Sequence, residues 1–369
     1  MIMIKIVSPS GAIDPQYIDR ATEVLRGWGY AVSAAEHARG KVGRFAASDD
    51  ERVADLADAL ADPAVDMILC ARGGYGLQRI IDRIPPIHKP IIGFSDITAL
   101  HILAAQTGQT TIHAMMCKGI MTLLDPPYKG REEMQRALAQ ETLHYELPAH
   151  PLNRAGKIKG TLVGGNLSVL YGLQGPAYGL DERLRMKDER LNSADSEHPR
   201  PLPPSPQAGR GSFGGRTSMT AGEDACAPGQ NSPSSCVLHP SSQESPSSLS
   251  PSLCREGWGG SPLILFIEDV GERHYHVDRM MNNLRLSGVL AKISGLIVGQ
   301  FSDCEDDSSM GCTVYETIRH AVEPYHYPVV FNFPAGHVEE NMPLYLNAPV
   351  EIDVREDYSS SIHSFFKSS

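Results

Sequence analysis

The sequence predicts an α/β protein in which an N-terminal, mainly parallel sheet flanked by helices is followed by a β-rich C-terminal domain. Short apolar runs alternate with amphipathic helical segments up to Ala114, which is typical of βαβ units. From Lys157 onward, short strands with turn signals between them dominate. A chain of 369 residues is longer than one hydrophobic core usually supports. We therefore expect two domains, at residues 1–150 and 151–369.

Three apolar runs are predicted to form the first strands of the N-terminal sheet: MIKIVSPSG, MILCARGGYG and PIIGFSD. One predicted helix begins at Pro15, a first-turn position that suits proline, and stops near Gly29. A second begins at Asp49 with acidic residues in its first turn, where the helix dipole favours them. Each apolar run ends in a Gly- or Ser-containing loop. Because open α/β sheets bind ligands at the carboxyl ends of their strands, these loops should converge on one crevice.

The C-terminal domain contains four predicted strands: GKIKGTLVGGNLSVL, PLILFIEDVGE, ISGLIVGQF and APVEIDV. A segment from about Asn192 to Pro262 interrupts them and contains 11 of the 27 prolines. This segment has few β-branched or aromatic residues, so burial cannot offset the entropy lost on ordering it. We expect a disordered surface loop, inserted in the C-terminal domain.

Composition and charge limit the partners and the location. The chain has 41% hydrophobic and 21% charged residues, which is ordinary for a folded globular protein. A formal net charge of -11 without a dense Lys/Arg cluster argues against a nucleic-acid partner. No apolar run approaches the ~20 residues of a membrane-spanning helix, and MIMIKIVSPSG lacks the features of a signal peptide. We expect no membrane partner and a cytoplasmic location.

The cysteines and histidines show no pattern of a metal centre. The seven cysteines include no CxxC pair, which argues against both a zinc site and a disulfide framework. His274 and His276 have the spacing of two ligands on a strand, but no third ligand motif lies nearby. We expect no metal and no cofactor.

A sharp turn from strand to helix is predicted within IIGFSDITAL. Such a nucleophile elbow would expose the hydroxyl of Ser95 above the sheet edge, with the backbone amide of Asp96 facing the same space. The motif departs from G-x-S-x-G because Ile97 replaces the second glycine. The alternative is that Ser95 only caps the following helix.

The glycine-rich loop ARGGYG follows another predicted strand. Backbone amides of Gly73 and Gly74, together with that of Asp96, could form an oxyanion hole that stabilises charge on a carbonyl oxygen. A phosphate-binding loop is the alternative, but the Walker Lys-Ser/Thr pair is missing. Anion stabilisation without a nucleotide is the better interpretation.

A serine nucleophile needs a base, and the base needs an orienting acid. His337 lies in a Pro/Gly loop after the apolar run PVVFNF, where a polar ring can be presented at the end of a strand. Glu268 follows five apolar residues, so it should be buried and paired. The alternatives for Glu268 are bonding to the backbone or to Arg279. Asp269 and Glu272 are the competing acids.

Six motifs occur in an order that resembles the LD-carboxypeptidase family of serine peptidases, which includes the related microcin C immunity peptidases. These motifs are ARGGYG, IIGFSD, GGNLSVL, LFIEDVGE…DRMMNNL, ISGLIVGQF and FPAGH…PL. The resemblance covers nearly the whole chain apart from the Ser/Pro-rich segment and the polar C-terminal tail. It implies a triad of Ser95, His337 and Glu268, the oxyanion amides named above, and a cytoplasmic homodimer without metal.

The resemblance also implies a substrate, the murein tetrapeptide, from which the terminal D-alanine is removed after an L-centred diamino acid during cell-wall recycling. Such an exopeptidase must recognise the free carboxylate of D-alanine. Arg72 and the amides of GGNLS, at Gly165 and Asn166, are the candidates for this substrate-binding role.

Two other functions remain open. The first is a microcin-type immunity peptidase that cleaves aminoacyl-nucleotide conjugates, which needs an aromatic side chain to stack on adenine. Neither Trp28 nor Trp258 is clearly placed for that stacking. The second is a non-catalytic remnant, disabled by the insertion that separates Ser95 from Glu268.

Overall fold

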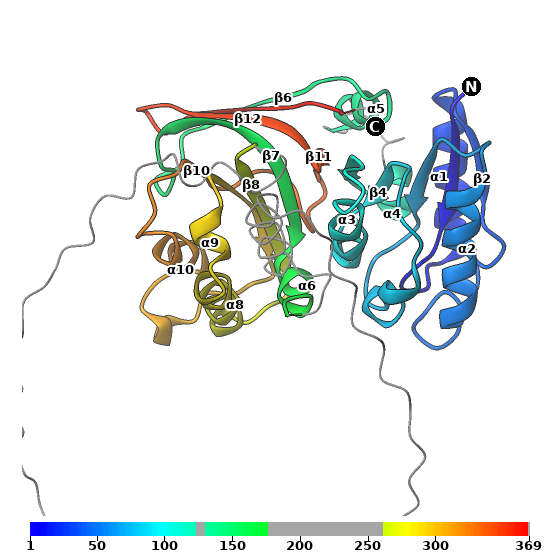
Figure 1. Ribbon diagram of the computed structural model, residues 1–369, viewed down its shortest axis with the longest axis horizontal. Helices are drawn as coiled ribbons and strands as arrows, with labels where there is room; N and C mark the ends of the chain where they lie inside the picture. Colours follow the sequence, from blue (N-terminus) through cyan, green and yellow to red (C-terminus); the bar gives the residue numbers. More distant parts are fainter. Residues whose placement is uncertain (123–129, 176–260, 368–369) are drawn as a thin grey trace, which may run out of the picture.

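The structure is a computed structural model that describes residues 1–122, 130–175 and 261–367. The predicted disordered loop at 192–262 lies outside the described residues, except for its last two positions, Ser261 and Pro262. The described chain forms two sheets that lie next to each other, each with its own helices (Figure 1). The predicted α/β class is confirmed, since the N-terminal sheet is mostly parallel and the C-terminal sheet is mixed.

The N-terminal sheet has six strands in the order β11-β5-β4-β3-β1-β2. All neighbouring pairs are parallel except β11 with β5, which is antiparallel. The strands are β1 (Met3–Val7), β2 (Ala31–Ala34), β3 (Met67–Cys70), β4 (Ile91–Gly93), β5 (Thr111–His113) and β11 (Leu344–Leu346).

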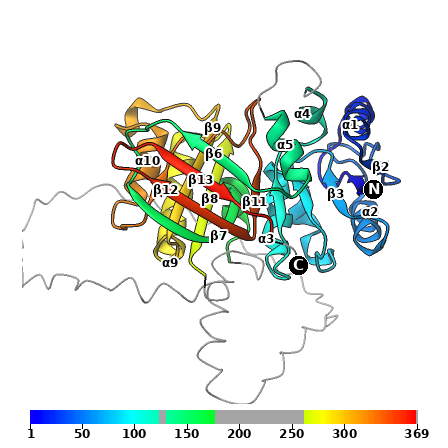
Figure 2. The same ribbon diagram turned by 90° about the horizontal axis from the view of Figure 1, so that it is seen from above.

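Helices cover both faces of this sheet, with α1 and α2 on opposite sides (Figure 2). The α-helices are α1 (Pro15–Gly27), α2 (Asp49–Ala61), α3 (Thr98–Ala104), α4 (Cys117–Thr122) and α5 (Arg131–Leu138). Three short 3-10 helices accompany them: η1 (Leu77–Arg79), η2 (Ile81–Arg83) and η3 (Ser95–Ile97). The two predicted helix starts are correct, because the Asp14 side chain caps α1 and Ser48 forms a capping box with Glu51 at α2.

The C-terminal sheet has seven strands in the order β10-β9-β8-β7-β12-β13-β6. Its parallel part runs from β10 to β7, and its antiparallel part from β7 to β6. The strands are β6 (Leu143–Leu147), β7 (Gly156–Asn166), β8 (Leu263–Val270), β9 (Gly295–Ser302), β10 (Val329–Val330), β12 (Ala348–Val354) and β13 (Ser360–Ser364). The helices are α6 (Leu167–Gly172), α8 (His274–Leu286), α9 (Val289–Lys292), α10 (Val314–Ala321) and the 3-10 helix η5 (Ser308–Met310).

One predicted strand is shorter than expected. The run GKIKGTLVGGNLSVL is a strand only as far as Asn166. The Asn166 side chain accepts a hydrogen bond from the Val169 backbone amide at 3.1 Å and so caps the start of α6. Among the described residues, no helix is both long and apolar enough to cross a membrane.

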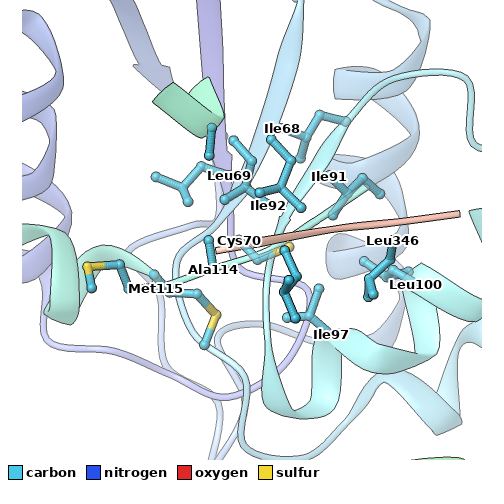
Figure 3. Close-up of a cluster of buried hydrophobic side chains, with 14 of the residues drawn as sticks. Ile68, Leu69, Cys70, Ile91, Ile92, Ile97, Leu100, Ala114, Met115 and Leu346 are labelled. Carbon is cyan, nitrogen blue, oxygen red and sulfur yellow. The ribbon is translucent and has the colours of Figure 1, made fainter. Parts of the chain in front are cut away.

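The two sheets exchange strands across residue 150, the expected domain boundary. Strand β6 precedes that residue but pairs with β13 in the C-terminal sheet. Strand β11 comes late in the chain but pairs with β5 in the N-terminal sheet. Leu346 of β11 therefore joins the apolar cluster built from β3, β4 and α3 (Figure 3). The cluster continues to β8, where Phe266 is fully buried, so one hydrophobic core connects both sheets.

Candidate active site

A cavity of about 660 Å³ opens at the carboxyl ends of the N-terminal strands. Residues from the loops after β1, β3 and β4 line it, including Ile13, Gly73 and Ser95. The chain after β5 contributes Met115 and Met116, and the loop after β10 contributes His337. Residues far apart in the sequence therefore face one space, at the sheet edge where this fold class binds ligands.

Ser95 occupies a strained elbow. Its φ of 66° lies in the left-handed region, which is unfavourable for a residue with a Cβ atom. It begins η3, whose N-cap is Phe94, and α3 has Ile97 as N-cap, in both cases without a capping side-chain hydrogen bond. Ser95 therefore does not cap a helix, and its half-buried side chain lines the cavity. Strain of this kind is found where a side chain is held in place for function.

The glycine-rich loop lies directly against this elbow. A Cβ atom on Gly73 would lie 2.9 Å from the Cβ of Ser95 and 3.2 Å from the amide nitrogen of Asp96. Gly74, with a φ of 103°, also lines the cavity. The buried Asp96 carboxylate fixes this contact, because it accepts hydrogen bonds from the Ser10 hydroxyl and from the Leu77 amide.

His337 is positioned by Glu268. Its Nδ1 lies 2.9 Å from Oε2 of that carboxylate, which is fully buried, whereas 21% of the His337 side chain is exposed. The preceding Gly336 has a φ of 132°, and a Cβ atom there would lie 2.9 Å from Glu268 Oε2. Only glycine allows the loop to approach the carboxylate so closely. The pairing of β8 with β9 also shifts register between Ile267 and Asp269, which places Glu268 at an irregularity.

A second imidazole lies on the other side of Glu268. His113, fully buried at the end of β5, places its Nε2 3.9 Å from Glu268 Oε1. This distance exceeds hydrogen-bond range, so the contact is electrostatic. Burial is the largest influence on Glu268 and raises its pKa, but His113 and His337 together outweigh burial and lower the pKa to about 2. Glu268 is therefore a carboxylate at neutral pH.

The competing residues have other partners. The Asp269 carboxylate accepts hydrogen bonds from the Asn166 amide group at 2.9 Å and the Ser168 backbone at 2.8 Å. Glu272 Oε2 lies 2.9 Å from Nδ1 of His276, and the Arg279 guanidinium lies 5.6 Å from the centre of the Tyr275 ring. His274 contacts the Thr317 hydroxyl at 2.7 Å. In the part of the chain that the structure describes, no group of three His, Cys, Asp or Glu residues could hold a metal ion.

The three predicted substrate-binding residues differ in location. Arg72 lines the cavity, and its Nη1 donates a hydrogen bond to the Ala12 carbonyl at 2.7 Å. Gly165 and Asn166 do not line the cavity. A Cβ atom on Gly165 would clash with the Thr98 hydroxyl, and the backbone amide of Asn166 donates a hydrogen bond to that same hydroxyl at 2.9 Å. Both residues thus join β7 to α3.

Sequence reasoning missed two charged or titratable residues of the site. Lys118, on α4, is exposed and lines the cavity as its second cation beside Arg72. His113 had only one sequence signal, a polar ring at the end of the short β-branched run TTI. Neither residue belongs to the motifs that carry the resemblance.

Two family profiles match this chain. The profile of the LD-carboxypeptidase N-terminal domain matches residues 4–114, and that of the LD-carboxypeptidase C-terminal domain matches residues 253–352. A Bacillus subtilis protein named "Probable murein peptide carboxypeptidase" is 24% identical over 363 residues, covering 96% of this chain and 89% of the relative. The murein tetrapeptide carboxypeptidase of Pseudomonas aeruginosa is 27% identical over 191 residues, covering 48% of this chain and 62% of the relative.

Solved structures share the fold. The muramoyltetrapeptide carboxypeptidase from Oxalobacter formigenes has a TM-score of 0.69 at 20% identity, with 98% of each chain covered. The microcin C7 self immunity protein MccF, in its wild-type apo state, has a TM-score of 0.67 at 18% identity, with 99% of this chain and 96% of that chain covered. The match of both domain profiles, on a fold shared along nearly the whole chain, shows that this protein belongs to the LD-carboxypeptidase family.

Proposed function

We propose that this chain is a serine carboxypeptidase that releases the terminal D-alanine of a murein tetrapeptide, with Ser95, His337 and Glu268 as its catalytic triad. One observation carries the proposal: an imidazole oriented by a buried carboxylate and a serine on a strained elbow line the same cavity. The names of two relatives, a probable murein peptide carboxypeptidase and a murein tetrapeptide carboxypeptidase, support the choice of substrate.

The contact with Glu268 decides which nitrogen of His337 acts as the base in the acylation step. Because Nδ1 faces Glu268, Nε2 is the nitrogen that takes the proton from the Ser95 hydroxyl. The serine oxygen then attacks the carbonyl carbon of the L,D-peptide bond, and the negative charge moves to the carbonyl oxygen. Amides of Gly73, Gly74 and Asp96 are the proposed donors to that oxyanion. Glu268 stabilises the imidazolium that forms.

Release of the products returns the proton. The tetrahedral intermediate collapses, the C–N bond breaks, and His337 donates its proton to the amine of the leaving D-alanine. Water then enters, His337 removes a proton from it, and the resulting attack on the ester carbonyl frees the tripeptide acid. Ser95 regains its proton in that second collapse, so the enzyme ends as it began.

Exopeptidase action needs a cation for the terminal carboxylate. Arg72 and Lys118 are the two basic side chains that line the cavity, among the residues the structure describes. We propose that one or both of them bind the D-alanine carboxylate by charge-assisted hydrogen bonds. A tetrapeptide and its C-terminal amide distinguish this role, because only the acid carries the charge that these residues would bind.

The deciding experiment measures D-alanine release from L-Lys and meso-diaminopimelate tetrapeptides by the wild type, Ser95→Ala, and a variant trimmed between Asn192 and Gly260. Release by the wild type that is absent only in Ser95→Ala supports the proposal. Release by the trimmed variant alone supports the triad and assigns a blocking role to the insertion. If none of the three proteins releases D-alanine but the wild type cleaves an aminoacyl-nucleotide conjugate, the murein tetrapeptide is not the substrate and a microcin-type activity replaces it. If no substrate is cleaved but the tetrapeptide still binds, the protein is a non-catalytic binding protein.

The cytoplasmic location and the homodimer implied by the family stay predictions. Sedimentation velocity over a range of protein concentrations tests the second. A species at twice the 40.1 kDa chain mass supports the dimer, and a single species at the chain mass contradicts it.

A further inference from the structure

A second cavity adjoins the candidate active site. It has a volume of about 730 Å³ and shares Ile13, Asp14, Arg72 and Gly74 with the first cavity. The two cavities therefore lie next to each other, with Arg72 in the wall of both. A substrate held with its scissile bond at Ser95 can therefore extend into this neighbouring space, which we call the basic cavity.

Four cations line the basic cavity: Arg39, Lys41, Arg44 and Arg72. They gather there in a chain whose formal net charge is -11, so this region differs in sign from the protein as a whole. A cleft lined by charges of one sign concentrates their field and attracts ligands of the opposite sign. The electrostatic preference of the cavity is thus for an anion.

The positive charges that line the basic cavity are only partly neutralised by the protein. Its single acid, Asp14, uses one carboxylate oxygen for the Gln16 amide and the other for the Gln16 side chain. Arg39 is ion-paired with Asp19 at 2.7 Å. In contrast, Lys41 makes no ion pair with the described parts of the chain, and the Arg44 guanidinium faces the Tyr75 ring, 5.4 Å from its centre. Two exposed cations are therefore available to a ligand.

We propose that the basic cavity is a subsite for an oxyanion carried by the acyl part of the substrate, upstream of the scissile bond. The inference rests on the proposed function and names a second recognition element for it. A murein peptide carries free carboxylates besides its terminal one, and a phosphate linked to the sugar end of a larger precursor has the same chemistry. Lys41 and Arg44 supply the free positive charge, and Arg72 lies in the wall shared with the catalytic cavity, which leaves Lys118 as the cation for the D-alanine carboxylate.

The test compares wild type with the double variant Lys41→Ala/Arg44→Ala. The control is Lys157→Ala/Lys159→Ala, which removes two positive charges from β7 at residues that line neither cavity. Substrates are a tetrapeptide with its upstream carboxylates free and the same peptide with them amidated. We expect the cavity variant to raise KM for the free acid about fivefold with kcat unchanged, a typical effect for exposed charge pairs. KM for the amidated peptide stays constant.

Inorganic pyrophosphate, as a competitor, distinguishes the two sources of the oxyanion. Stronger inhibition of the wild type than of the cavity variant supports a phosphate site. Equal inhibition of the two proteins, together with a higher KM of the cavity variant for the free-acid peptide, supports a site for the carboxylates of the peptide. Equal KM values for wild type and the cavity variant on both peptides, with equal inhibition by pyrophosphate, overturn the subsite while leaving the carboxypeptidase intact. If neither the wild type nor the trimmed variant releases D-alanine, the proposed function fails. Calorimetric titration of Ser95→Ala and its Lys41→Ala/Arg44→Ala derivative with pyrophosphate then decides the subsite, since about fivefold weaker binding supports it and equal binding refutes it.

Discussion

Nε2 of His113 lies 3.9 Å from Oε1 of Glu268, while Oε2 of the same carboxylate lies 2.9 Å from Nδ1 of His337. One buried acid is thus held between two imidazoles, of which only His337 reaches the cavity. We therefore predict that His113 is a positioning residue, which acts on the proposed reaction only through Glu268.

Replacing His113 by phenylalanine should lower kcat about tenfold, equivalent to about 1.4 kcal/mol of transition-state stabilisation. Phenylalanine preserves the ring packing against Phe94 and Phe266 but removes an influence that lowers the pKa of Glu268. That pKa should rise, so kcat/KM should fall more steeply at low pH than in the wild type, as Glu268 becomes protonated. KM should change little, since His113 does not line the cavity.

His101→Phe is the matched control, because His101 is equally buried but bonds to the Gly93 carbonyl at 3.0 Å and not to Glu268. Thermal melts of both variants check that they fold. An unchanged acidic limb in His113→Phe, or the same shift in both variants, contradicts the positioning role.

The strain at Ser95 should be measurable as stability. Ser95→Ala and Ser95→Gly both remove the nucleophile, and both should abolish D-alanine release. Only glycine adopts a φ of 66° without steric cost, so Ser95→Gly should exceed Ser95→Ala in free energy of unfolding by about 1 kcal/mol. Urea denaturation followed by circular dichroism measures the difference. Equal stability of the two variants would show that the elbow carries no strain.

The close approach of the glycine loop predicts a strong effect of one methyl group. Gly73→Ala should reduce kcat/KM at least tenfold, because its Cβ would lie 2.9 Å from that of Ser95 and displace the elbow. Gly27→Ala is the control, since a Cβ there meets no atom within 4 Å and alanine favours the end of α1. A fully active Gly73→Ala enzyme would rule out this contact as a determinant of the site.

Asp269 should make stability depend on pH. Burial, the largest influence, raises its pKa from 3.8 to about 6, although hydrogen bonds such as that from Ser168 oppose the shift. The folded state therefore binds this proton more tightly than the unfolded state, so the stabilisation is complete below pH 3.8 and is lost as pH rises through about 6. The free energy of unfolding of the wild type should fall between pH 4.5 and 7 relative to Asp269→Asn. Denaturant titrations at several pH values measure this, and parallel curves for the two proteins would refute it.

Much of the fold was predictable because local patterns agreed with it. The alternation of apolar runs and amphipathic segments predicts the α/β class, and capping residues such as Ser48 mark the helix starts. The run APVEIDV is a strand over its full length, with alternating burial that matches a period of two. At Asn166 the pattern was misleading, since apolar residues continue from a strand into a helix without a break in hydrophobicity.

The features of the fold and of the site that could not be predicted depend on contacts between residues that are distant in the sequence. Nothing within Leu344–Leu346 indicates that this short strand leaves its neighbours to pair with β5. Likewise, His113 and Glu268 are far apart in the sequence, and their proximity results from the packing of β5 against β8 through pairs such as His113 with Phe266. Ser95, Glu268 and His337 were predictable as candidates, because each comes at or after the end of an apolar run in the sequence. The interaction of His113 with Glu268 was not predictable.

The pairing of β11 with β5 also affects how the protein is made. A ribosome synthesises β5 long before it synthesises residues 344–346, so the nascent N-terminal sheet has an unpaired edge during most of translation. An open edge of this kind can pair with another chain and aggregate. The apolar surface that Leu346 later covers is exposed during the same period. Synthesis of the N-terminal segment alone should therefore require chaperone protection, whereas the complete chain closes its own sheet.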